Sequence, residues 1–261
     1  MKLKSIITLI LLLSGVFSFS QLNQMDSKGK KHGKWIMKYK GKDAIRYKGV
    51  FEHGVPQGIF LFYYESGKIK VKNKYLPGGK DSFALTYHEN GKKMSYGKFV
   101  NQKRDSVWRY YNDEGNLIAL DTYKDGKKHG KSLVFYTFNR LAEDTRTRVL
   151  EISWYKFGER EGDWHKFYNN GKMMAEGTYE AGVLEGRVTY FYTTGKKKMV
   201  IHYKHGIKQG FTFNYDGNEK LTSKQYYKNG TEMKGKMLTD YLARKKKRIL
   251  EKRKKEKKLK N

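Results

Sequence analysis

Apolar and aromatic residues in this chain come in short runs that are separated by polar turns containing glycine. Such runs occupy residues 35–39, 59–64, 176–179 and 199–203, among others. Runs of this length that are rich in Tyr, Phe, Val and Ile, and that end at Asn-Gly or Asp-Gly, are typical of β-strands joined by tight turns. The pattern therefore predicts an all-β chain made of successive hairpins.

The glycines give the period of these hairpins, which is 24 residues with one longer copy. They stand at Gly54, Gly78, Gly126, Gly158, Gly182, Gly206 and Gly230, with Gln102 in one glycine slot and Gly29 opening an earlier copy. Three residues before the slot stands an aromatic residue: Phe51, Tyr75, Phe99, Tyr123, Tyr155, Tyr179, Tyr203 or Tyr227. Later in each copy comes a tyrosine: Tyr39, Tyr64, Tyr87, Tyr111, Tyr136, Tyr168, Tyr192 or Tyr215. This agreement indicates a tandem repeat.

Each copy is one hairpin, so residues 29–230 are predicted to form an elongated, single-layer antiparallel sheet of about eight tandem β-hairpins. A lone hairpin is marginally stable in water, and each copy must therefore depend on its neighbours. A single layer offers little thickness for burial, so large rings and lysine stems are expected to cover one another. We therefore interpret the repeated aromatic residues as the core.

The repeat resembles the MORN family, in the variant common in bacterial proteins named for the YwqK antitoxin component. The pattern Gly-x-x-x-Gly-x-Trp occurs at residues 29–35 and 158–164, Tyr-x-x-Gly-Lys at 168–172, and Tyr-x-x-Gly at 179–182. The chain departs from the pattern where Ser82, Gln102 and Ser106 replace glycines. The resemblance implies a MORN-like sheet. It does not identify a partner, because these repeats are a shared scaffold and a fold does not fix a function.

The chain outside the repeats divides into an N-terminal signal, a short segment and a basic C-terminal part. Residues 1–20 combine Lys2 and Lys4, an apolar run, and small residues at positions 18 and 20, which predicts a signal peptide cleaved before Gln21. Residues 21–28 are a short N-terminal segment.

The fifth copy carries eight extra residues within 137–151, which form either a tolerated surface insertion or a binding loop.

Residues 231–261 are predicted to be a basic amphipathic helix and tail. Apolar residues recur at helical spacing from Lys236 to about Leu250, and we expect this helix to cover the open edge of the last hairpin. The cations that follow are interpreted either as a solvated charge run or as an anionic-surface binding site. The candidate binding residues are Arg244, Lys245, Lys246, Lys247, Arg248, Lys252, Arg253, Lys254 and Lys255.

The composition of the chain excludes several classes of function. The formal net charge is 56 − 26 = +30, and the absence of cysteine excludes disulfides, thiol catalysis and cysteine-ligated metals. No nucleotide-binding, hydrolase or metalloprotease motif appears, so we expect no catalytic residues, no metal and no cofactor. The prediction is an exported, non-enzymatic repeat protein, periplasmic, outer-membrane-associated or secreted. It would bind a protein partner or an anionic envelope surface, meaning lipid, lipopolysaccharide or another polyanion.

The alternative function is an antitoxin or immunity-type protein that neutralises a toxin by direct binding. Export argues against a nucleic-acid partner, and no second apolar stretch predicts a transmembrane segment after signal cleavage. The sequence leaves the oligomeric state open.

Overall fold

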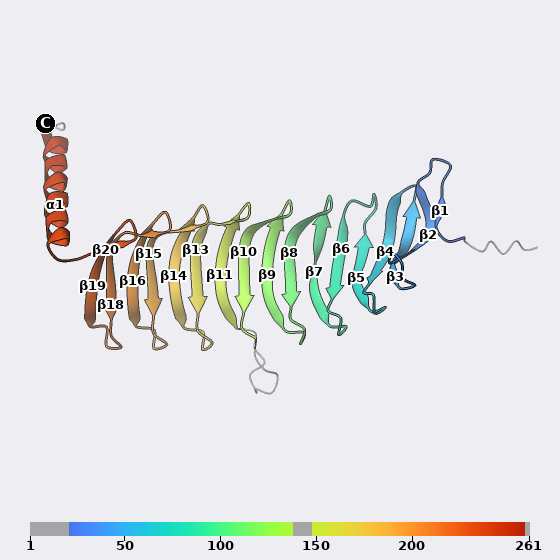
Figure 1. Ribbon diagram of the computed structural model, residues 1–261, viewed down its shortest axis with the longest axis horizontal. Helices are drawn as coiled ribbons and strands as arrows, with labels where there is room; N and C mark the ends of the chain where they lie inside the picture. The colour runs from blue at the N-terminus through green and yellow to red at the C-terminus, as the bar shows by residue number, and fades with distance from the viewer. Residues whose placement is uncertain (1–20, 138–147, 259–261) are drawn as a thin grey trace, which may run out of the picture.

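The structure is a computed structural model that describes residues 21–137 and 148–258, with the side chains of Lys257 and Lys258 left out. The predicted signal peptide and most of the fifth-copy insertion lie outside the described residues. The described chain forms one long, open, twisted sheet with a single helix at its C-terminal end (Figure 1).

The sheet contains 20 strands, and each pairs antiparallel with its neighbours along the chain. They are β1 Gln24–Met25, β2 Lys31–Lys38, β3 Ile45–Glu52, β4 Val55–Tyr63, β5 Ile69–Tyr75, β6 Ser82–Tyr87, β7 Lys93–Val100, β8 Lys103–Tyr111, β9 Leu117–Lys124, β10 Lys127–Phe135, β11 Val149–Lys156, β12 Glu159–Arg160, β13 Gly162–Phe167, β14 Met173–Glu180, β15 Val183–Phe191, β16 Lys197–Lys204, β17 Ile207–Lys208, β18 Gly210–Tyr215, β19 Leu221–Lys228 and β20 Thr231–Met233. Since β12 continues into β13 and β17 into β18 across one residue each, β2 to β19 make eight hairpins. The predicted fold class is confirmed.

The glycine slot is explained by the turns between hairpins. Asp125 and Gly126 have φ of 51° and 84°, and Asn229 and Gly230 have φ of 50° and 82°. This left-handed pair suits a two-residue turn between strands, and glycine adopts it without steric cost. The Gly126 N–H also donates to the carbonyl of Arg104, 2.8 Å away in the previous hairpin. The repeated glycine therefore shapes its own turn and ties it to the turn before.

The core is a row of side chains on one face of the sheet, which we call the core face. One residue per hairpin comes from the first strand: Trp35, Phe60, Ala84, Trp108, Ser132, Trp164, Val188 and Thr212. Opposite these, the second strands place Gly49, Asn73, Gly97, Asp121, Ser153, Gly177, Ile201 and Gln225. All of the first-strand residues except Trp164 are buried.

The aromatic residues that precede the glycine slot join this row, as expected. Phe99 lies edge-on to Trp108 with ring centroids 5.0 Å apart, and Tyr179 lies edge-on to Trp164 at 6.1 Å. Edge-to-face pairs of this kind are favoured by the charge distribution of the rings. The sheet is therefore stabilised by runs of aromatic contacts along the core row and not by a second layer.

The other repeated tyrosine slot links neighbouring hairpins through hydrogen bonds. The Tyr168 hydroxyl donates to the carbonyl of Phe191 at 2.7 Å, and Tyr192 donates to that of Tyr215 at 2.8 Å. Tyr39, Tyr64 and Tyr136 make the same bond to the following hairpin, and all five rings are half-buried. In the third copy the bond comes from His88, one residue after Tyr87. These residues form a hydrogen-bonded ladder along one edge of the hairpins.

The C-terminal end differs from the prediction in two ways. The short strand β20 pairs with residues 226–228 of β19, and the helix α1, Gly235–Lys258, runs past the expected end near Leu250. The extension follows from the composition, because Lys, Arg and Glu are good helix formers and no Gly or Pro interrupts them.

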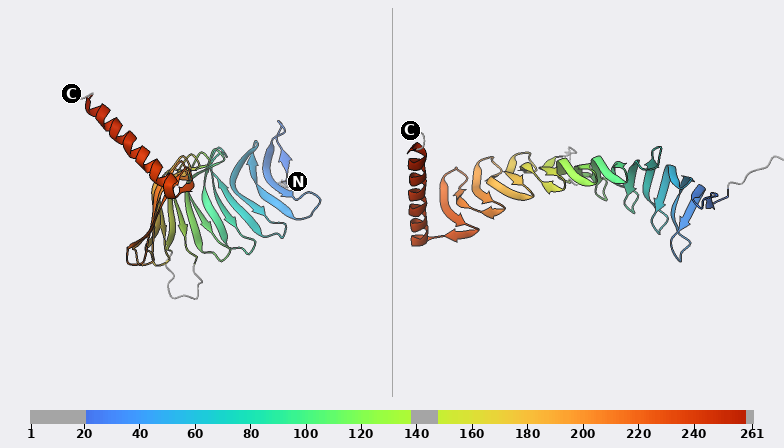
Figure 2. Two further views of the ribbon diagram at one scale, coloured as in Figure 1. Left: turned by 60° about the vertical axis from the view of Figure 1, so that its left-hand side comes forward. Right: turned by 90° about the horizontal axis from the view of Figure 1, so that it is seen from above.

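The expected cover of the last edge is also only partial. Residues 221–224 of β19 remain exposed, and α1 contacts Tyr226, which points to the face opposite the core row. Figure 2 shows α1 projecting away from the end of the sheet. The helix therefore covers part of a face, while β20 pairs with one end of the edge.

Candidate functional site

The nine predicted binding residues all lie on α1, and one of them, Lys245, also contacts the sheet. All nine side chains, from Arg244 to Lys255, are exposed. Among the described residues, Lys252 is the member of this set that forms an ion pair, with Glu256 at 3.8 Å. Six of the nine, from Lys247 to Lys255, stand in the C-terminal half of the helix, and the helix dipole favours positive charge near that end. The result is a projecting rod of largely unneutralised positive charge.

The helix is held to the sheet by Tyr226, whose exposed fraction is 2%. Its ring lies 5.6 Å from that of Tyr241, and Lys245 Nζ donates to its hydroxyl at 3.3 Å. Burial raises the pKa of Tyr226, a hydrogen bond with Tyr241 adds to this, and the bond from Lys245 opposes it. The phenol therefore stays neutral, and Lys245 is both an anchor and a member of the candidate set.

A second set of cations, which the sequence analysis missed, lies on the core face. Lys31, Arg104, Lys128, Arg160 and Lys208 each lie over the ring that precedes the next glycine slot, at distances of 5.0, 5.5, 5.0, 5.0 and 5.1 Å. We call these five residues the cation row. Its signal was present in the repeat, because each member stands two residues after the glycine slot or its equivalent.

The middle of the cation row is neutralised within the sheet. Lys128 Nζ lies 2.9 Å from Asp121, which also accepts from Ser132 at 2.7 Å, and Arg160 lies 2.7 Å from Glu151. Burial alone would lower the pKa of Arg160, but hydrogen bonds to Tyr155 and the charge of Glu151 raise it above its usual value. These cations stabilise the sheet, whereas those of α1 remain available to a partner.

The described part of the chain also bears on metal binding and on membrane insertion. It contains no group of three or more His, Asp or Glu side chains placed to hold a metal ion. Within residues 21–137 and 148–258, no helix is both long and apolar enough to cross a membrane.

Parts of the repeat region match a known protein-family model. Residues 56–76, 104–125, 160–181 and 184–205 match the family model described as MORN repeat variant. These four segments are similar to MORN repeats. Each spans most of one hairpin, and all four begin two residues after the glycine slot, where the cation row lies. MORN repeats generally serve as binding or scaffold modules. A search of curated proteins found no match. The resemblance to the YwqK-type antitoxin variant stays a prediction.

Proposed function

We propose that this MORN-repeat chain is an exported, non-enzymatic binding module that attaches to an anionic envelope surface through α1. The observation that supports the proposal is the exposure of all nine candidate cations on a helix that projects from the sheet. The rest of the sheet supports a scaffold role, because its own cations on the core face are occupied with aromatic rings and carboxylates.

The expected energetics favour a membrane-like surface over a single small anion. Each cation near an anionic membrane contributes about 1 kcal/mol, and screening within ~8 Å at physiological salt limits this to the residues that touch the surface. Ile249 and Leu250 are also exposed, at 45% and 47%, on the same helix. A helix with exposed apolar residues and many cations is suited to lie at a lipid interface.

Vesicle co-sedimentation tests the proposal. A variant in which Lys246, Lys247, Lys254 and Lys255 become Gln keeps the helix, Lys245 and the contact with Tyr226. It should bind phosphatidylglycerol vesicles far more weakly than the parent at low salt, and the difference should vanish as salt rises. Phosphatidylcholine vesicles are the control surface.

Two results would contradict this function. Equal binding by the Gln variant would move the site onto the sheet and reduce α1 to a solubilising charge run. Tight binding to the product of an adjacent gene, with no vesicle binding, would favour the antitoxin alternative instead.

Export is tested separately by N-terminal sequencing of the native protein after cell fractionation. We expect the mature chain to begin at or near Gln21 in an envelope or extracellular fraction. A cytoplasmic protein that retains Met1 would exclude this localisation.

A further inference from the structure

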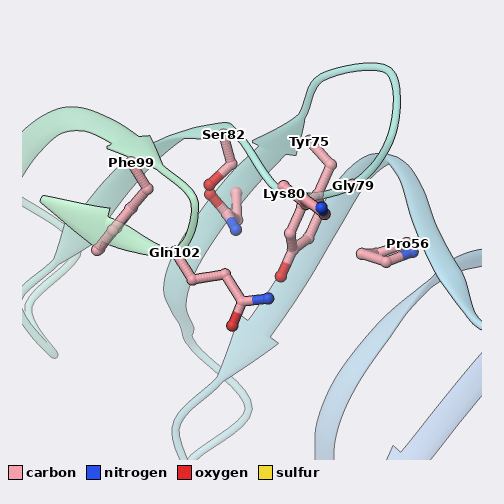
Figure 3. Close-up of a pocket in the computed structure, with 8 residues that line it drawn as sticks. Pro56, Tyr75, Gly79, Lys80, Ser82, Phe99 and Gln102 are labelled. Atoms are coloured by element: carbon pink, nitrogen blue, oxygen red, sulfur yellow. The ribbon is translucent and has the colours of Figure 1, made fainter. Parts of the chain in front are cut away.

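The cation row is interrupted at the second hairpin, and a hollow opens there on the core face. Pro56 occupies the position that holds Lys or Arg in the five hairpins of the cation row. The hollow has a volume of about 320 Å³, with Tyr75 and Phe99 among its lining residues. In Figure 3, these two rings stand on opposite sides of Ser82, and the Gln102 carboxamide extends toward Tyr75.

Asn73 lines this hollow and is buried to 91%, since its exposed fraction is 9%. Its Oδ1 is fully buried and has no hydrogen-bond partner within the described residues. Leaving a buried acceptor unpaired costs free energy, so a site of this kind favours a ligand that supplies a donor. The corresponding position is a glycine in three other hairpins, at residues 49, 97 and 177. It is polar in three more, but Asp121, Ser153 and Gln225 each have a hydrogen-bond partner within the sheet, unlike Oδ1 of Asn73.

The lining restricts the chemistry of a ligand. Lys80 stands at the hollow and no carboxylate lines it, so a cationic ligand is disfavoured. A sulfate has acceptors only and leaves the Asn73 Oδ1 unpaired. A purely apolar ligand leaves it unpaired as well. The hollow suits a ligand with hydroxyl donors, several acceptors and a flat apolar face that can lie against Tyr75 or Phe99.

We infer that this hollow binds a sugar ring of a glycan. Asn73 accepts from a sugar hydroxyl, Lys80 and Gln102 donate to ring or substituent oxygens, and the two aromatic rings contact the apolar face of the sugar. The inference is independent of α1, because it concerns the second and third hairpins, at the other end of the sheet.

The test is saturation-transfer NMR with three probes: chitotetraose, cellotetraose and tetragalacturonate. At least one should bind and shift the side-chain amide resonances of Asn73 and Gln102. Pro56→Lys places a cation over Tyr75, as in the hairpins of the cation row, so it should fold normally and fill the hollow. We expect it to weaken binding about tenfold or more, because the lysine side chain takes the space that the sugar ring would occupy.

Leu184→Lys is the matched control, because Leu184 occupies the same repeat position in the seventh hairpin and the change in charge is identical. It should bind the probe as the parent does. Gln102→Gly restores the repeat residue at a position with φ of 64°, and should keep the fold while weakening binding.

The inference is overturned by any of three results: no probe binds, Leu184→Lys weakens binding as much as Pro56→Lys, or choline binds in place of the sugars. None of these results bears on vesicle binding by α1, so the two proposals fail separately.

Discussion

Gly97 has no room for a side chain, although it lies in the middle of a strand and its φ is not left-handed. A Cβ built at this position would lie 2.2 Å from the ring of Trp108 in the next hairpin. Gly49 stands in the same relation to Phe60, at 2.5 Å. Asn73 is possible at this repeat position because the next hairpin presents only Ala84. Large and small residues are therefore matched between neighbouring hairpins along the core row.

A double-mutant cycle at Gly97 and Trp108 tests this matching. Gly97→Ala should lower the free energy of unfolding by about 2–3 kcal/mol, because overpacking forces the ring or the backbone to move. In a Trp108→Ala background the same change should cost less than about 0.5 kcal/mol, since the clash is gone. Chemical denaturation of the four proteins measures the coupling, and additive losses would show that the ring does not press on Gly97.

Tyr168 tests the hydrogen-bonded ladder. Tyr168→Phe removes only the hydroxyl that donates to Phe191, so it should cost about 1 kcal/mol of unfolding free energy. Tyr111→Phe is the control, because Tyr111 lies one residue before the ladder position and contributes a carbonyl to it. Equal losses in the two variants would mean that the tyrosine slot stabilises the sheet through its rings and not through the ladder.

The sequence predicts the repeat and its turns well at this scale, but it does not distinguish the roles of individual residues. Gly126 and Gly97 look alike in a sequence, although one supplies a left-handed turn and the other gives space to a ring. The one-residue offset between Tyr87 and His88 is equally invisible, because Tyr and His both donate a hydrogen bond at the ladder position. The hollow at Asn73 depends on what several strands place together, which no local pattern reveals.

At the scale of elements, the end of the sheet is where local pattern and observed structure differ most. The helix was predictable from the spacing of Leu238, Tyr241 and Leu242, whereas β20 was not. Three residues are too short for a periodic signal, and β20 forms because β19 offers an unpaired edge. The helix then meets Tyr226 on the face opposite the core row, which depends on the register of the last hairpin.

Tyr226→Ala should detach α1 from the sheet. Tyr226 is the buried ring that contacts Tyr241 and bonds Lys245, so its loss should cost about 3 kcal/mol or more and remove hydrogen-exchange protection from residues 236–243. Phe213→Ala, on the same face but earlier in β18, should leave that protection intact. Unchanged exchange in Tyr226→Ala would show that α1 is held by β20 alone.

At the scale of the whole molecule, each hairpin pairs only with the hairpins on either side of it. Stability is then close to a sum of hairpin terms and interface terms, and no contact joins distant repeats. The charge distribution follows the same division. Members of the cation row lie against rings and carboxylates of the sheet, whereas the nine candidate cations on α1 are exposed. Binding at α1 and folding of the sheet are therefore expected to be separable.

Removal of one whole repeat tests this modular architecture. Deleting residues 182–205 removes β15 and β16 and joins Ala181 to Gly206. The new junction reproduces an existing turn, because Ala181 and His205 have φ of 47° and 50° and each is followed by a left-handed glycine. The shortened chain should fold to a sheet of seven hairpins with unchanged vesicle binding. Its denaturant slope should fall by about an eighth, in proportion to the surface lost.

A deletion of half a repeat is the control for that experiment. Removing residues 194–205 takes out one strand, so every later strand would have to reverse its direction or its pairing. The circular dichroism spectrum and the cooperative transition of the sheet should then be lost beyond the junction. A half-repeat deletion that unfolds as cooperatively as the whole-repeat deletion would show that the strand, and not the hairpin, is the unit of assembly. Loss of all structure in the whole-repeat deletion would instead require contacts that skip a hairpin, contrary to the pairing of β14 with β15 and of β16 with β18.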